Sequence, residues 1–360
     1  MILDSLATQV RYLRQSVEWH LQGNHLFVNG KALLQAGLLF DGQEAEDWRR
    51  EGAAIVEVGL REQVLADGGH FERTPMYHAL ALEDVLDLLN IRRIYAVAAD
   101  GLPELAGRMW GWLEQLTHGD GELAFFNDAT HEVAAGLGEL AAYAGRLGVV
   151  KECRALAGSG FVRLEGGGVT VLMDAGSVGP SYQPGHAHAG TLSVEISVGG
   201  RRIVVNQGIS TYEKNAQRQW ERGTGAHSTV MVDGIDSSEV WGGFRVARRA
   251  GVVNRVGGLN WVEAAHDGYR GVVHRRRVGL NSDVVEIRDR VEGGGWHKVE
   301  VLFHSGPGES GDGVVLDKRL GREIRKGEYH RGFGMSEPIV TVVGVWEGVL
   351  PVEFSSVVTC

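Results

Sequence analysis

The sequence predicts an α+β fold, with a helical N-terminal half followed by a sheet-rich C-terminal half. Through residues 1–150, apolar side chains recur at three- and four-residue spacing, which is typical of helices that bury one face. From about residue 160, apolar residues alternate at period two between glycines, the pattern of short antiparallel strands. A chain of 360 residues with 43% hydrophobic content can bury the cores of two domains. We therefore expect a helical bundle or toroid over residues 1–155 and an antiparallel β-sandwich over residues 156–360.

Within the first half, polar, glycine-containing breaks separate the segments with helical spacing. The helical segments are 3–21, 31–40, 48–65, 76–91, 103–118 and 138–148. The breaks between them include 22–25, 66–75, 99–103 and 119–132. Because loops on a rigid scaffold often carry functional side chains, the unusual polar residues of these breaks are candidates for a site.

The second half is predicted to form antiparallel strands joined by glycine turns. The alternating segments are 160–176, 191–208, 228–234, 260–280 and 282–293. The chain has only 7 prolines, so no proline-rich linker marks the domain boundary, which we place near residues 151–158. Within the fourth segment, the HRRR stretch 274–277 is expected to be a solvated strand face.

Composition disfavours several classes of protein. The formal net charge is −10, and residues 1–150 carry 11 Lys and Arg against 22 Asp and Glu. Such a balance argues against nucleic acid as a partner. The two cysteines, Cys153 and Cys360, lie far apart, which argues against a disulfide framework and against a cysteine metal site.

No signal peptide and no apolar stretch of roughly 20 residues is visible. We therefore expect a soluble chain with no transmembrane segment, cytoplasmic as written. A translation start upstream of Met1 would leave a periplasmic or envelope location open. The oligomeric state cannot be inferred from the sequence.

The stretch 182–234 is the strongest candidate for a functional site. His186 and His188 would share one face if their segment is a strand. With His227 as a third imidazole and Asn206 as an oxygen donor, they could complete a metal site. The alternative is a pair of cross-strand histidines on a solvated face.

Two breaks of the helical half carry further candidates. Asn24 and His25 follow a glycine at a helix break, either as a helix cap beside a surface histidine or as a donor pair for a substrate carboxylate. Tyr77 stands at the start of a helix, either as a partly buried structural residue or as a proton-transfer group. In the second case, Arg73 would hold an anion or lower the pKa of the phenol, which is about 10 when unperturbed.

Other residues near the 182–234 stretch could contact a ligand. Tyr212 and Arg218 lie in the loop that precedes His227, and Trp241 lies among glycines in segment 236–250. We expect them to bind sugars or anionic groups, with an interdomain contact as the alternative for Trp241. The His-Ala-His spacing is also found in cupins, but Glu195 comes too late for their pattern.

Four stretches together resemble the heparinase II/III-like polysaccharide lyases, closest to bacterial members that occur with surface-polysaccharide genes. They lie at 23–40, 67–78, 185–213 and 223–250. The resemblance implies an (α/α) toroid followed by an antiparallel β-sandwich, with the active site in the cleft between them. About 150 helical residues is fewer than the full toroid of the family needs, so the toroid is expected to be shortened.

The resemblance also implies roles for single residues. Asn24 and His25 would neutralise the substrate carboxylate, Tyr77 would be the catalytic tyrosine, and His186 would assist proton transfer. His188 and His227 match metal-binding histidines, whereas Asn206 stands where the family has an aspartate. Because a neutral amide compensates less of the charge of a divalent ion, zinc would bind weakly or not at all.

The implied activity is cleavage of an acidic, uronic-acid-containing polysaccharide by β-elimination, without an organic cofactor. In that reaction Tyr77 or His186 would abstract the C5 proton, and Tyr77 would protonate the leaving oxygen. One alternative is a non-catalytic glycan-binding or polysaccharide-assembly protein on the same fold. A second alternative is a cupin-like metal oxidoreductase that holds iron or manganese through His186 and His188.

Overall fold

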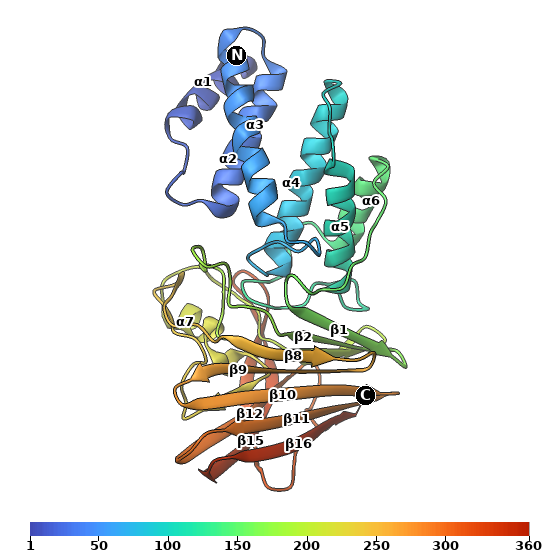
Figure 1. The fold of residues 1–360 in the computed structure, drawn as a ribbon, viewed down its shortest axis with the longest axis vertical. Helices are drawn as coiled ribbons and strands as arrows, with labels where there is room; N and C mark the ends of the chain where they lie inside the picture. Colours follow the sequence, from blue (N-terminus) through green and yellow to red (C-terminus); the bar gives the residue numbers. More distant parts are fainter. Residues whose placement is uncertain (360) are drawn as a thin grey trace.

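The computed structural model describes residues 1–359, in which a helical half stands end to end on a β-sandwich (Figure 1). The helices are α1 (Ile2–Gln15), α2 (Gly23–Leu39), α3 (Gln43–Gln63), α4 (Pro75–Ile94), α5 (Leu102–Gln115) and α6 (Leu137–Arg146). None of the helices in this part of the chain is both long and apolar enough to cross a bilayer. The α+β fold expected from the sequence is confirmed.

Glycines let α2 and α3 pack with their backbones in contact. A Cβ atom on Gly52 would lie 2.3 Å from the backbone nitrogen of Leu34, and one on Gly37 would lie 2.4 Å from that of Arg49. Any larger residue would therefore push the two helices apart. The apolar stripes of the helices then face inward and form a core that includes Leu82, Leu86 and Met109.

The first helix break falls elsewhere than the spacing predicts. α1 ends at Gln15, and a turn at residues 19–21 precedes α2, which begins at Gly23. Asn24 and His25 therefore lie in the first turn of a helix and not in a loop. The backbone of Gln22 has φ 57° and that of Gly23 has φ 54°, so this entry into α2 uses two consecutive left-handed residues. Glycine is the residue that adopts this conformation most readily.

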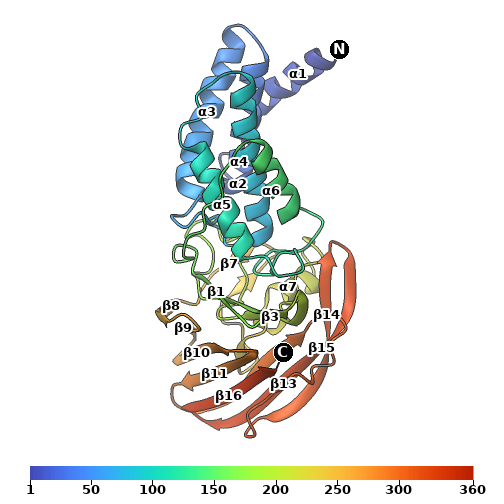
Figure 2. The ribbon, with the colours of Figure 1, turned by 90° about the vertical axis from the view of Figure 1, so that its right-hand side faces the viewer.

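The C-terminal half is a sandwich of two sheets in which the paired strands run antiparallel (Figure 2). The eight-stranded sheet has the order β1-β2-β3-β4-β12-β15-β14, with β5 paired to β12. Its strands are β1 (Phe161–Gly166), β2 (Val169–Asp174), β3 (Val194–Val198), β4 (Arg201–Val205), β5 (Val230–Val232), β12 (Trp296–Ser305), β14 (Gly321–Gly332) and β15 (Met335–Val349).

The six-stranded sheet has the order β13-β16-β11-β10-β9-β8. Its strands are β8 (Val252–Gly257), β9 (Trp261–Tyr269), β10 (Val272–Asn281), β11 (Val284–Glu292), β13 (Val314–Val315) and β16 (Val352–Thr359). Inward-facing residues of both sheets, such as Ile196, Phe303 and Ile287, share one core. This alternation between inner and outer faces is the period-two pattern of the sequence.

One strand shows why the HRRR stretch cannot be a solvated face as a whole. β10 alternates between buried and partly exposed residues, so His274 and Arg276 point inward while Arg275 and Arg277 point outward. Arg276 donates to both carboxylate oxygens of Asp289, at 2.8 and 2.9 Å. The expectation was wrong for the two inward-facing residues, because period two places neighbours on opposite faces.

Loops of both halves meet between the helices and the sandwich. The segment between α5 and α6 enters this junction, where Phe125 donates its backbone N–H to Glu195 of β3 at 3.0 Å. Arg202 of β4 donates to Asp120 of the same segment at 2.7 Å. The short helix α7 (Ala216–Arg222), the 3₁₀ turn Thr224–Ala226 and the hairpin of β6 (Val240–Trp241) and β7 (Arg245–Val246) complete the junction.

Candidate active site

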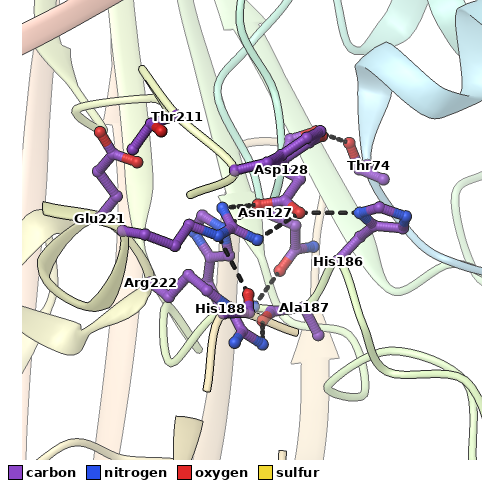
Figure 3. A network of polar contacts seen from close by, with 12 residues as sticks. Thr74, Asn127, Asp128, His186, Ala187, His188, Thr211, Glu221 and Arg222 are labelled. Carbon is purple, nitrogen blue, oxygen red and sulfur yellow. Dashed lines mark hydrogen bonds and ion pairs between the residues drawn. The ribbon is translucent and has the colours of Figure 1, made fainter. Parts of the chain in front are cut away.

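A buried carboxylate, Asp128, lies at the centre of the junction and binds both histidines of the His-Ala-His motif (Figure 3). His186 Nδ1 donates to Asp128 Oδ2 at 2.8 Å, and His188 Nε2 donates to Asp128 Oδ1 at 2.7 Å. Arg218 of α7 forms a bidentate ion pair with the same carboxylate. Three segments far apart in the sequence thus converge on one side chain.

The charges of this group are fixed by its surroundings. Burial opposes ionisation of Asp128, but the Arg218 guanidinium and the two imidazoles more than offset it and hold the pKa of Asp128 well below its usual range. Burial lowers the pKa of His188 to about 4, against the opposing effect of Asp128. An ionised carboxylate only accepts hydrogen bonds, so it assigns a proton to the facing nitrogen of each imidazole.

Backbone contacts hold the Asp128 segment and the histidine segment together. Residues 186–188 do not form a strand, contrary to the geometry expected for two histidines on one face. Instead, Asp128 N donates to the His186 carbonyl at 3.0 Å, and His188 N donates to Asn127 Oδ1 at 3.0 Å. Arg222 supports the turn from the other side by donating to the Ala187 carbonyl at 2.9 Å.

Tyr77 lies directly against His186. The two ring centroids are 3.9 Å apart with planes inclined by 30°, and the Tyr77 hydroxyl lies 3.0 Å from that of Tyr212. Burial raises the pKa of Tyr77 above its ordinary value, and it raises the pKa of Tyr212 as well. Both phenols therefore keep their protons at neutral pH.

Neither of the arginines expected to bind an anion is placed to do so. Arg73 donates to the backbone carbonyls of Ser159 at 2.8 Å and Gly179 at 3.1 Å, so it ties two loops of the sandwich half to the helical half. It does not lower the pKa of Tyr77, which is raised. Arg218 is fully buried, and its guanidinium neutralises Asp128 from inside the protein.

His186 and His25 line the same cavity, which lies between the helical half and the sandwich. The cavity has a volume of about 570 Å³, and its wall includes Tyr182, Trp241, Phe244 and Arg245. Asn24 is partly buried beside His25 and is not among the lining residues. A larger cavity of about 870 Å³ lies among α1, α2 and α4, but it is mainly apolar and distant from the histidines.

His188 lies against His227, with Asn206 held next to the following residue, Ser228, but this donor set has no anionic ligand and so suits zinc poorly. His188 Nδ1 lies 3.3 Å from His227 Nε2, so the second imidazole can donate to the first. Asn206 Oδ1 accepts from the backbone N–H of Ser228 at 3.1 Å, while its buried Nδ2 has no partner. Within residues 1–359, no three His, Cys, Asp or Glu side chains gather to hold a metal ion.

Sequence reasoning missed the residues that organise this site. Asp128 and Asn127 lie in a break noted only for its unusual polar residues, and Glu72 lies beside Arg73. The signal available was weak, because a single aspartate in a loop is usually solvated. Its role follows from three-dimensional proximity to residues 58 and 90 positions away.

The arrangement defines a class of protein in which a helical domain and an antiparallel β-sandwich enclose a histidine- and tyrosine-lined cleft. The sequence matches the family described as heparinase II/III-like, C-terminal, over residues 149–334 and the heparinase II/III N-terminus over residues 1–132. The chain therefore belongs to the heparinase II/III-like family.

Individual relatives support this assignment. The chain is 27% identical to a heparin-sulfate lyase of Pedobacter heparinus over 64% of its length and 39% of the relative. It is 28% identical to FtsZ-localized protein C of Caulobacter vibrioides over 70% of its length and 46% of the relative. The chain thus spans less than half the length of these relatives.

Solved structures share the fold. The crystal structure of the heparan sulfate lyase HepC from Pedobacter heparinus aligns with a TM-score of 0.76 at 19% identity, over 99% of this chain and 63% of that one. A crystal structure of heparinase III aligns with a TM-score of 0.80 at 16% identity, over 98% and 63% of the two chains.

Proposed function

We propose that this chain is a polysaccharide lyase that cleaves uronic-acid-containing glycans by β-elimination. The observation that supports it most is the position of His186, which lies against Tyr77 and lines the same cavity as His25. Elimination at C5 needs a base, an acid for the leaving oxygen and a group that stabilises charge on the carboxylate. These three residues supply the three functions.

His186 is the proposed base. Because its Nδ1–H donates to ionised Asp128, Nε2 is the nitrogen left to accept a proton. Asp128 then stabilises the imidazolium that forms, and Arg218 keeps the carboxylate ionised throughout. A buried carboxylate that orients a histidine in this way is the arrangement that general-base catalysis requires.

Tyr77 is the proposed acid. Its raised pKa keeps the phenol protonated and leaves almost no tyrosinate to act as a base, so Tyr77 can donate its proton to the O4 oxygen as the bond breaks. The Tyr212 hydroxyl at 3.0 Å can return a proton to Tyr77 or orient it. This division of roles favours His186 over Tyr77 as the base, because the Tyr77 phenol stays protonated.

Asn24 and His25 are proposed to bind the substrate carboxylate. Both lie in the first turn of α2, where the helix presents unsatisfied N–H groups and the positive end of its dipole. Trp241 and Arg245 lie on the same cavity wall, where an aromatic face and a cation suit an acidic sugar. No step of the proposal passes through a metal.

The test is incubation with heparan sulfate and other uronate polymers, followed by ultraviolet detection of the C4–C5 double bond. We expect Tyr77→Phe and His186→Gln each to lower the rate by roughly a hundredfold or more. Tyr95→Phe is the matched control, because Tyr95 is exposed at the end of α4, and it should keep full activity. Wild-type-like rates in both site variants would refute the assignment.

A non-catalytic glycan-binding or polysaccharide-assembly role is the second candidate. It is favoured by the similarity to FtsZ-localized protein C and by Asn206 in place of the expected aspartate. This role predicts saturable binding of acidic oligosaccharides, measured by calorimetry, without the appearance of new unsaturated ends. Detection of such ends at a rate that depends on Tyr77 would exclude it.

A further inference from the structure

Glu72 is a buried carboxyl group without a hydrogen-bond partner. Its side chain is 1% exposed, and neither of its oxygens has a partner among the residues described. Burying such a group unpaired is costly, so most buried polar groups are satisfied. Glu72 is therefore an exception to the rule that buried polar groups are paired.

The surroundings of Glu72 connect it to the cleft. Glu72 Oε1 lies 3.4 Å from where a Cβ of Gly23 would be, next to the first turn of α2. That helix begins without a side-chain cap. Glu72 Oε2 lies 3.9 Å from Nδ1 of His70, a buried atom that also lacks a partner. Unsatisfied polar atoms of Glu72 and His70 therefore lie close to the start of α2.

Burial and the nearby ionisable groups set the protonation state of the Glu72 carboxyl. His70 is neutral, because burial lowers its pKa to about 3. Burial raises the pKa of Glu72 to about 7, with Asp128 adding to the rise and His186 opposing it. Tyr77 and Tyr182 also lie within range of its charge, and both remain neutral phenols. Glu72 thus changes charge near neutral pH.

We propose that Glu72 is a positioning residue whose protonation sets how strongly the cleft binds an anionic group at the first turn of α2. Ionised Glu72 places a negative charge behind Gly23 and repels an anion from Asn24 and His25. Protonated Glu72 removes that charge and leaves the helix terminus free to attract the anion. The inference rests on the proposed function, in which this turn receives the substrate carboxylate.

The experiment compares wild type with Glu72→Gln, which keeps the shape and removes the titration. Affinity for a heparan sulfate oligosaccharide is measured by calorimetry between about pH 5.5 and 8.5. All other titrating groups are common to both proteins, so the informative quantity is the ratio of their affinities. We expect a ratio near one at the low end that rises to about tenfold in favour of Glu72→Gln at the high end.

Glu57→Gln is the matched control, because it removes an exposed acid from α3 and should leave the ratio to wild type constant. Infrared difference spectra of wild type against Glu72→Gln, without ligand, report the protonated carboxyl directly. If Glu72 is ionised throughout this pH range, or if the affinity ratio does not change with pH, the inference is overturned.

Inorganic sulfate separates failure of this inference from failure of the proposed function. It is added at each pH, and its binding is read as a thermal shift. If the oligosaccharide does not bind but sulfate shows the Glu72-dependent response, the inference stands and the proposed function falls. If the oligosaccharide binds with a constant ratio, the function stands and Glu72 has only a structural role.

Discussion

Asp128→Asn tests whether one carboxylate both joins the two halves and orients the base. In the wild type, this side chain accepts from His186, His188 and both terminal nitrogens of Arg218. Asparagine keeps one acceptor oxygen and replaces the other by a donor. It also leaves the fully buried Arg218 without a counter-charge. Breaking a buried ion pair in this way costs about 3–5 kcal/mol of the free energy of unfolding.

Urea unfolding of wild type, Asp128→Asn, Arg218→Met and the double variant measures this cost. Because the two residues interact directly, the double variant should lose less than the two single losses combined, with a coupling of about 1–3 kcal/mol. Asp120→Asn is the matched control. Its carboxylate also pairs with an arginine, Arg202, but its side chain is 29% exposed. We therefore expect a loss of about 1 kcal/mol.

Activity supplies the second measurement on Asp128→Asn. With an amide in place of the carboxylate, His186 loses the acceptor that assigns its proton to Nδ1, so the proposed lyase activity should fall by about a hundredfold or more. A loss of less than about 1 kcal/mol in the free energy of unfolding, or additive losses in the double variant, would show that the Asp128–Arg218 ion pair does not hold the two halves together. Full activity in a destabilised but folded variant would refute the orienting role alone.

Three further predictions follow from single contacts. Burial lowers the pKa of His188 to about 4 in the folded state, below its unfolded value of about 6.5. The neutral His188 side chain therefore contributes fully to the free energy of unfolding above about pH 6.5. About 3 kcal/mol of that free energy is lost as the pH falls to 4. Urea midpoints of wild type should decline over that range more steeply than those of His188→Gln, and parallel curves would contradict the assignment. Asn206→Asp should lower the melting temperature without zinc and respond to added zinc with a stabilisation of about 2.7 kcal/mol at a hundredfold excess over Kd, whereas wild type should not respond. Gly52→Ala should cost about 2 kcal/mol or more, because its Cβ meets the backbone of Leu34. Gly138→Ala, with open space around it in α6, should instead stabilise by about 0.5–1 kcal/mol.

The fold was predictable because burying one face of each helix or strand imposes a regular spacing on the apolar residues of the sequence. Stripes at helical spacing locate α3 through α6, and alternation locates strands such as β9, β10 and β11. The start of α2 was not predictable, because two left-handed residues, Gln22 and Gly23, place the helix entry inside an apparent break. Local backbone geometry of this kind leaves no periodic signal.

The site was predictable only in part. His188 and His227 meet, and His186 meets Tyr77, as the motif suggested. The roles of Arg73 and Arg218 were not predictable, since an arginine that binds a ligand and one that binds the protein interior look the same in sequence. What separates them is burial, and burial at a domain junction depends on contacts between distant segments.

The Asp128 group also limits how the cleft can move. Its carboxylate belongs to the helical half, whereas His186, His188 and Arg218 belong to the sandwich half. Opening the two halves at this point would expose or separate a buried ion pair and cost several kcal/mol. A hinge here would therefore be populated only rarely. Adjustment to a substrate is expected instead at the exposed part of the cavity wall, where the side chain of Trp241 is 48% exposed. The proposed base is thus held rigid, while the surface proposed to contact the sugar remains free to adapt.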